Sequence, residues 1–124
     1  MSPNKRILLV DDEEGFLTMM RAALEVRGFE VITAVSAIEA GLTLASANPD
    51  LILMDIRMPG VDGIQACVAI KKNADTAYIP IMIVSALADE TQIERAHKIG
   101  IDDYFVKPID IEKLVNRIKQ VLAV

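Results

Sequence analysis

The stretch Ile7-Leu8-Leu9-Val10-Asp11-Asp12 places two carboxylates directly after four large apolar residues. A short apolar run of this kind is typical of a strand that is buried on both faces of a parallel sheet. Two later runs have the same form, because residues 51–54 precede Asp55 and residues 104–106 precede Lys107. The carboxyl ends of parallel strands meet at one edge of a sheet, so we expect these polar side chains to gather there.

Short apolar runs alternate with longer stretches of helical period along the whole chain. The apolar runs are residues 7–10, 31–34, 51–54, 81–84 and 104–106, and the helical stretches are residues 16–27, 38–47, 64–72, 88–99 and 111–124. Gly28 is well placed to end the first of these helices. Five strand-helix units with short connections imply right-handed crossovers. The pattern therefore predicts an α/β fold, a doubly wound five-stranded parallel sheet with five helices on both faces.

The size and composition of the chain fit a single domain covering residues 1–124. At 124 residues, of which 52% are hydrophobic, the chain can bury one core of ordinary size. The net charge of −5 argues against a nucleic-acid or anionic-membrane surface and leaves proteins and cations as expected partners. The first apolar run stops at Asp11, too short for a signal sequence or a membrane span. We expect a soluble, cytoplasmic protein, and the single cysteine, Cys67, fits a reducing compartment.

The expected cluster of Asp11, Asp12 and Asp55 needs compensating charge. Three carboxylates close together are unfavourable unless protons or a cation offset them, and a bound divalent ion is the simpler answer. A few ligands, all of them oxygen, suit Mg²⁺, which keeps several waters, better than Ca²⁺, which needs a fuller set of protein ligands. Taken alone, the Asp11-Asp12 pair is better explained as a solvated loop or a helix cap. Its combination with Asp55 and Lys107 favours the metal site.

Asp55 also has the chemistry of a nucleophile. Where the chain leaves the sheet, its carboxylate can attack phosphorus and form an acyl phosphate, provided that a metal and a cation offset the phosphoryl charge. Lys107 would supply that cation. Ser85, after residues 81–84, offers a hydroxyl to a phosphoryl oxygen, although a role as cap for the next helix fits it equally well. Lys107-Pro108 is either an ordinary turn or a cis peptide that aims the lysine.

Four separated motifs strongly resemble the receiver domain of two-component response regulators. They are, in order, Val10-Asp11-Asp12, Leu53-Met54-Asp55-Ile56-Arg57-Met58-Pro59-Gly60-Val61-Asp62-Gly63, Val84-Ser85-Ala86 and Val106-Lys107-Pro108. The match covers essentially the whole chain. This family is itself a standard example of the flavodoxin-like strand order 2-1-3-4-5, so that order is implied by the resemblance and not by the spacing.

The resemblance also implies roles for the residues at the sheet edge. It makes Asp55 the phosphoacceptor of a signalling domain whose only catalysis is Mg²⁺-dependent self-phosphorylation and autodephosphorylation. The implied Mg²⁺ ligands are Asp12, Asp55 and the backbone carbonyl of Arg57, with Asp11 acting mainly through water. Ser85 and Lys107 would bind the phosphoryl oxygens.

A switch and its partners follow from the same resemblance. Tyr104 matches the aromatic position that turns inward when the Ser or Thr hydroxyl is drawn toward the phosphoryl group. Considered alone, it is an aromatic strand residue whose hydroxyl reaches solvent. The face expected to change comprises residues 88–99, Tyr104 and residues 111–124. The implied partners are a sensor histidine kinase or a histidine phosphotransfer protein, and a downstream protein or fused output domain. Dimerisation on phosphorylation is allowed, and direct nucleic-acid or membrane binding is not expected.

Two residues are expected to set the lifetime of the phosphate. The positions that flank the phosphoryl group in this family are Arg57 and Leu87 here. Neither side chain offers a carboxylate or amide to position an attacking water, so we predict slower unassisted loss of phosphate than in Arg57→Asn or Leu87→Glu. The alternative is that both side chains merely occupy exposed positions at the edge.

Other protein classes fit the sequence less well. An aspartyl-nucleophile phosphatase of the haloacid dehalogenase type should carry a second acid two residues after its nucleophile, where this chain has Arg57. In a flavodoxin, the acidic residues 11–14 would repel the flavin phosphate. A receiver-like module that binds partners without phosphorylation is the alternative function.

We interpret His97 as a solvated helical residue and Cys67 as a small buried thiol. The sequence leaves open whether the chain stands alone or belongs to a longer protein.

Overall fold

The computed structural model describes residues 4–58 and 60–124. Within these residues, five helices surround a five-stranded parallel sheet of order β2-β1-β3-β6-β7, and the short strands β4 and β5 form a separate antiparallel pair. The elements are β1 (Arg6–Val10), α1 (Glu14–Glu25), β2 (Glu30–Ala34), α2 (Ala37–Ala47), β3 (Leu51–Met54), β4 (Arg57–Met58), β5 (Val61–Asp62), α3 (Gly63–Lys72), β6 (Ile81–Ser85), α4 (Glu90–Lys98), β7 (Asp103–Val106) and α5 (Ile111–Leu122). With the short pair set aside, the main strands follow the order 2-1-3-4-5, and the predicted fold class is confirmed.

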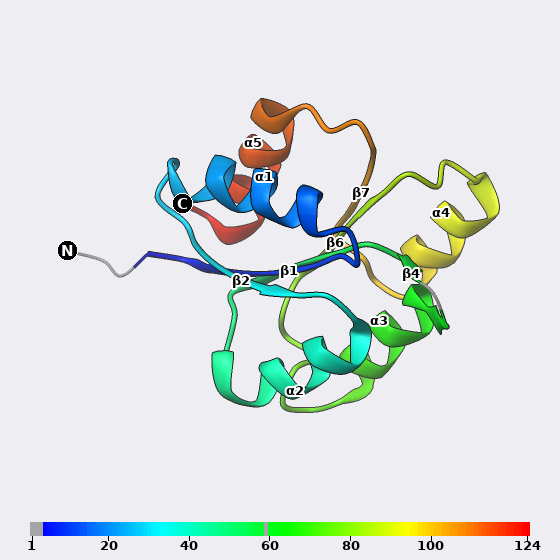
Figure 1. Cartoon of the computed structure of the whole chain (residues 1–124). Helices are drawn as coiled ribbons and strands as arrows, with labels where there is room; N and C mark the ends of the chain where they lie inside the picture. The colour runs from blue at the N-terminus through cyan, green and yellow to red at the C-terminus, as the bar shows by residue number, and fades with distance from the viewer. Residues whose placement is uncertain (1–3, 59) are drawn as a thin grey trace.

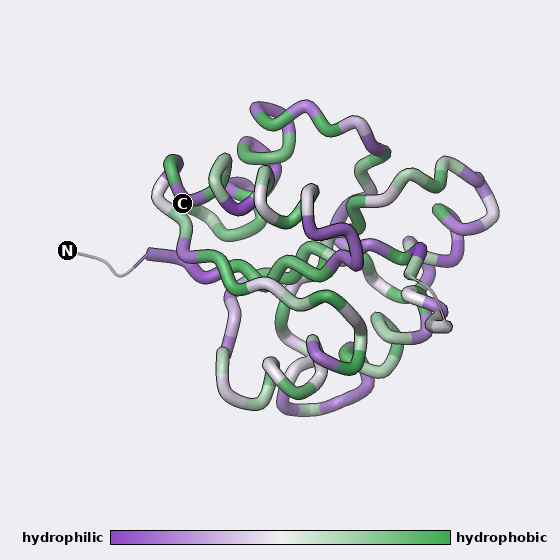
Figure 2. Tube along the Cα trace, viewed as in Figure 1, coloured by the Kyte–Doolittle hydropathy of each residue, from purple (hydrophilic) through white to green (hydrophobic). Residues whose placement is uncertain are grey.

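Helices cover both faces of the sheet, with α1 and α5 on one face and α2, α3 and α4 on the other (Figure 1). Strand β1 illustrates the reason. Ile7 and Leu9 pack with α1 and α5, whereas Leu8 and Val10 pack in the cluster of the opposite face. Successive side chains of a strand point to opposite faces, so a strand covered on both sides is an unbroken apolar run. Figure 2 shows these mainly hydrophobic strands in the middle of the molecule.

The helices begin and end within a few residues of the predicted positions, and the differences have local causes. Helix α4 begins at Glu90 and not at residue 88, because the Asp89 side chain caps it by accepting a hydrogen bond from the Thr91 backbone N–H. Helix α1 ends at Glu25. Gly28 lies in the turn beyond it with φ 93°, a conformation that favours glycine.

The segment after β3 contains a feature that the apolar pattern did not predict. Strands β4 and β5 pair in antiparallel fashion, and α3 follows directly. The first residue of α3, Gly63, packs against the backbone of Ile56, which follows Asp55. Pro59, which belongs to the motif quoted above, lies outside the described residues.

Cys67 and His97 have the ordinary structural roles expected of them. Cys67 is fully buried in α3, and burial raises the pKa of its thiol to about 12. His97 is exposed near the end of α4. Among the helices formed by the described residues, none combines the length and apolar character needed to cross a membrane.

We expect the stability contributed by Cys67 to fall above about pH 9. The native thiol keeps its proton up to a pKa of about 12, whereas an exposed thiol loses it near 9.0. The unfolded state therefore binds fewer protons in this interval, and the free energy of unfolding falls by at most about 1.4 kcal/mol per pH unit. Denaturant unfolding of the wild type and Cys67→Ala measures this, since the wild-type advantage should be constant below about pH 8 and shrink above about pH 9. A constant advantage up to about pH 10.5 would contradict the prediction.

Candidate functional site

Strand register brings the predicted site residues to one end of the sheet. Strands β1 and β3 end in register, so Asp11 and Asp55 are neighbours, and the Asp55 backbone N–H donates to the Val10 carbonyl (2.9 Å). Strands β6 and β7 also end in register, and the Lys107 backbone N–H donates to the Ser85 carbonyl (2.8 Å). The convergence expected from the apolar runs is therefore produced by backbone pairing.

Asp11, Asp12 and Asp55 form one acidic cluster, in which one carboxylate oxygen of each residue lies within 4.8 Å of the others. Asp11 and Asp55 are 1% and 6% exposed, whereas Asp12 is open to solvent. Burial raises the pKa of Asp11, and hydrogen bonds from Lys107 and the Glu13 backbone offset this only in part. All the donors in this cluster are hard oxygens, and solvent reaches Asp12. Such a site fits a divalent cation that keeps part of its hydration shell.

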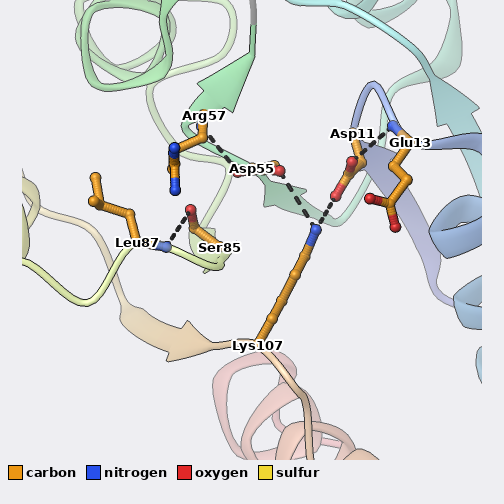
Figure 3. A network of polar contacts seen from close by, with 7 residues as sticks. All are labelled: Asp11, Glu13, Asp55, Arg57, Ser85, Leu87 and Lys107. Atoms are coloured by element: carbon orange, nitrogen blue, oxygen red, sulfur yellow. Dashed lines mark hydrogen bonds and ion pairs between the residues drawn. The ribbon is translucent and has the colours of Figure 1, made fainter.

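The Lys107 ammonium offsets part of this negative charge. Its Nζ lies 2.7 Å from Asp11 Oδ2 and 3.4 Å from Asp55 Oδ2. Figure 3 shows the three side chains pointing toward one another. Burial alone lowers the pKa of a lysine, but the hydrogen bond and charge of Asp11, together with Asp55, outweigh it and raise the pKa of Lys107. Lys107 is therefore a stable cation at this edge, and its peptide bond to Pro108 is cis.

Backbone N–H groups hold the other oxygens of the two buried carboxylates. The Arg57 N–H donates to Asp55 Oδ1 (2.9 Å), and the Glu13 N–H donates to Asp11 Oδ1 (2.9 Å). Aspartate commonly accepts such a bond from the residue two positions later in a turn. Each carboxylate thus has one oxygen tied to its own loop and one directed at Lys107 (Figure 3).

Ser85, Leu87 and Tyr104 form a second group of polar contacts. Ser85 is fully buried, and its Oγ accepts a hydrogen bond from the Leu87 backbone N–H (3.2 Å). It does not cap α4, whose cap is Asp89, so the alternative role of Ser85 as a helix cap is wrong. Tyr104 is half-buried, and its hydroxyl donates to the Leu87 carbonyl (2.6 Å). Burial also raises the pKa of Tyr104, so this hydroxyl stays protonated.

One neighbour of the site was not predicted. Phe16, on α1, lies against Lys107, whose Nζ is 3.9 Å from the ring centroid. In the sequence Phe16 is only one member of the apolar side of a helix. Helical period predicts that such a residue is buried, but not which distant side chain it contacts.

The structure thus combines a doubly wound parallel sheet with an acidic cluster and a lysine at the carboxyl ends of its strands. The chain matches the model of the response regulator receiver domain over residues 7–119 and belongs to this family. The resemblance drawn from the four motifs is therefore confirmed. The chain is a receiver domain of the kind found in two-component systems, a signalling domain.

Several relatives support this assignment. The chain is 38% identical to PilH of Pseudomonas aeruginosa, across 95% of this chain and 98% of that protein. It is 37% identical to the phosphate regulon transcriptional regulatory protein PhoB of Rhizobium meliloti, across 94% of this chain and 52% of PhoB. It thus spans about half the length of PhoB and of several other regulators. A CheY-like receiver domain protein from Methanospirillum hungatei has a similar structure, with a TM-score of 0.90 and 28% sequence identity. The match covers 97% of this chain and 94% of that chain.

Proposed function

We propose that Asp55 is a phosphoacceptor that takes its phosphoryl group from a histidine kinase or a histidine phosphotransfer protein. The observation that carries the proposal is the setting of the Asp55 carboxylate. One oxygen accepts a hydrogen bond from the Arg57 N–H, and the other faces the Lys107 ammonium at 3.4 Å, within the acidic cluster. A carboxylate held in this way has fixed positive charge beside it for an incoming phosphoryl group.

The transfer needs one bond to form and one to break. A carboxylate oxygen of Asp55 forms the new O–P bond while the P–N bond of the donor phosphohistidine breaks. The electron pair of that bond stays on the imidazole nitrogen, which takes up a proton. The Lys107 ammonium, which faces the Asp55 carboxylate before transfer, then pairs with an oxygen of the phosphoryl group on Asp55. Hydrolysis later breaks the aspartyl O–P bond, and water supplies the oxygen of the released phosphate.

A divalent cation is expected to belong to this site. Asp12 and Asp55, with the backbone carbonyl of Arg57, would hold Mg²⁺ directly, and Asp11 would act through water. When bound, the ion offsets the charge on the phosphoryl oxygens. The residues present supply what such an ion requires, since their donors are oxygens and Asp12 is open to solvent. Phosphorylation should therefore stop when the metal is removed with a chelator.

The signal is proposed to pass through Ser85 and Tyr104. A phosphoryl group on Asp55 attracts the Ser85 hydroxyl, whose oxygen otherwise accepts from the Leu87 N–H. The Tyr104 hydroxyl donates to the Leu87 carbonyl, so movement of the Leu87 backbone is transmitted to β7. The face formed by α4, β7 and α5 would then change its affinity for a downstream protein, a fused output domain or a second copy of the chain.

Intact-mass spectrometry after incubation with Mg²⁺ and acetyl phosphate tests the phosphoacceptor proposal. We expect one phosphate adduct that depends on Mg²⁺ and is removed by hydroxylamine, because hydroxylamine cleaves acyl phosphates and leaves phosphoserine intact. Borohydride reduction of the adduct should mark residue 55 in a peptide map. Folded protein that stays unmodified with Mg²⁺ present would favour the alternative function, a module that binds partners without phosphorylation.

Substitutions at Arg57 and Leu87 should shorten the life of the phosphorylated state. Figure 3 shows both side chains on the side of Asp55 away from Asp11. An amide in Arg57→Asn or a carboxylate in Leu87→Glu could position the attacking water, so we expect phosphate loss to become about tenfold faster. Decay of the adduct after removal of the donor measures this. Leu42→Glu, at a side chain on α2 that is 75% exposed, adds the same charge away from the site and should leave decay unchanged. Equal decay in all four proteins would contradict the prediction.

A further inference from the structure

Phe16 contacts the Lys107 ammonium from the hydrophobic core. Its ring centroid lies 3.9 Å from Lys107 Nζ, and the residue is 9% exposed. The ring belongs to the buried cluster between the sheet and helices α1 and α5, so neighbouring side chains hold it in place. A cation within about 6 Å of an aromatic centroid is attracted to the negative face of the ring, and more strongly where water is excluded.

The ring complements the two carboxylates that bind the same ammonium. A lysine ammonium has three N–H donors and no acceptor. Among the described residues, its hydrogen-bond acceptors are Asp11 Oδ2 and Asp55 Oδ2. The ring contributes attraction without an acceptor lone pair. A carbonyl or hydroxyl oxygen in its place would also hold the lysine, but it would compete with an incoming phosphoryl oxygen for an N–H.

We propose that Phe16 is a positioning residue for Lys107, and that its ring face holds the ammonium beside Asp55 while leaving a donor free for the phosphoryl group. Without the ring, only the carboxylates of Asp11 and Asp55 would hold the end of the flexible Lys107 side chain. A bound cation would also offset the charge of these carboxylates, so their hold on the lysine would weaken. The effect on phosphotransfer rests on the proposed role of Asp55, whereas the placement of Lys107 does not.

Fluorination of the Phe16 ring tests the proposal without changing the shape of the core. Each added fluorine withdraws charge from the ring face and weakens its attraction for a cation. We would incorporate mono-, di- and trifluorophenylalanine at position 16 and measure the rate constant of adduct formation with acetyl phosphate and saturating Mg²⁺. It should fall stepwise, by about threefold to tenfold in total. The same series at Phe29, a buried phenylalanine of the same cluster, is the matched control and should leave the rate unchanged.

A second readout follows Lys107 itself and does not depend on phosphorylation. Protons over an aromatic face are shifted upfield in NMR spectra. The ε-methylene protons of Lys107 should show this shift in the wild type, progressively less of it in the fluorinated series at position 16, and none in Phe16→Leu.

The two readouts separate the two proposals. If the wild type forms the Asp55 adduct but its rate and the Lys107 shift are flat across the series, Phe16 is only a core residue and the inference is wrong. If the wild type forms no adduct while the Lys107 shift follows the series, the phosphoacceptor role falls and the positioning of Lys107 by Phe16 stands.

Discussion

Asp55→Asn is expected to abolish phosphorylation by acetyl phosphate. The amide has the size of the carboxylate, and its oxygen can still accept the hydrogen bond from the Arg57 N–H. It lacks the anionic oxygen that attacks phosphorus. Asp12 is exposed, and the Asp11 carboxylate is already closely paired with the Lys107 ammonium at 2.7 Å, so we expect neither to replace Asp55 as the nucleophile. Incorporation should fall below detection in the intact-mass assay, a loss of more than about a hundredfold.

Measuring the stability of Asp55→Asn distinguishes a loss of phosphorylation from a loss of folded protein. The substitution removes one charge from an acidic cluster and weakens one ion pair at 3.4 Å, two effects of opposite sign. We expect the free energy of unfolding to change by less than about 1 kcal/mol. Asp50→Asn is the matched control, because Asp50 lies before β3, at the opposite end of this strand, and should allow phosphorylation at the wild-type rate. An adduct of undiminished yield on folded Asp55→Asn would place the phosphate elsewhere.

Gly63→Ala is expected to have the largest effect on stability. A Cβ at this position would lie 2.3 Å from the Ile56 Cα and 2.8 Å from its Cβ, distances at which something must move. The Ile56 Cα belongs to the backbone directly after Asp55, so no flexible side chain can absorb the clash. Overpacking of this kind costs about 3 kcal/mol, which chemical denaturation would measure as a lower midpoint. Displacement of Ile56 should also slow phosphorylation, because it moves the turn that orients Asp55.

Gly41→Ala is the matched control for this experiment. Gly41 lies within α2, and a Cβ there meets nothing within 4 Å. Alanine is the better helix former, so this variant should gain about 0.5–1 kcal/mol. Opposite changes in the two variants would attribute the effect to contact with Ile56. A loss of less than about 1 kcal/mol in Gly63→Ala would mean that the backbone around Asp55 yields easily.

Apolar runs and turn residues were enough to predict the fold class, whereas the strand order came from the resemblance to receiver domains. A strand covered on both faces must be apolar at every position, as in Ile7 to Val10, and runs of three or four such residues between turn residues are too short for a helix. Once the strands are parallel and in register, residues that follow them must meet at one edge. For this reason Asp11, Asp55 and Lys107 could be placed together from the sequence, and the motifs around them were specific enough to indicate the family.

Only the tertiary structure decided which side chains contact one another at the carboxyl edge of the sheet. Phe16 and Lys107 belong to α1 and to the segment after β7, and the approach of the ring to the ammonium depends on how α1 packs on the sheet. The direction of the Tyr104 hydroxyl likewise depends on the position of the Leu87 carbonyl, and the need for glycine at position 63 depends on the path of Ile56. Periodicity specifies which face of an element is buried. It contains no information about which distant atom that face will meet, because that is set by the packing of all the elements together.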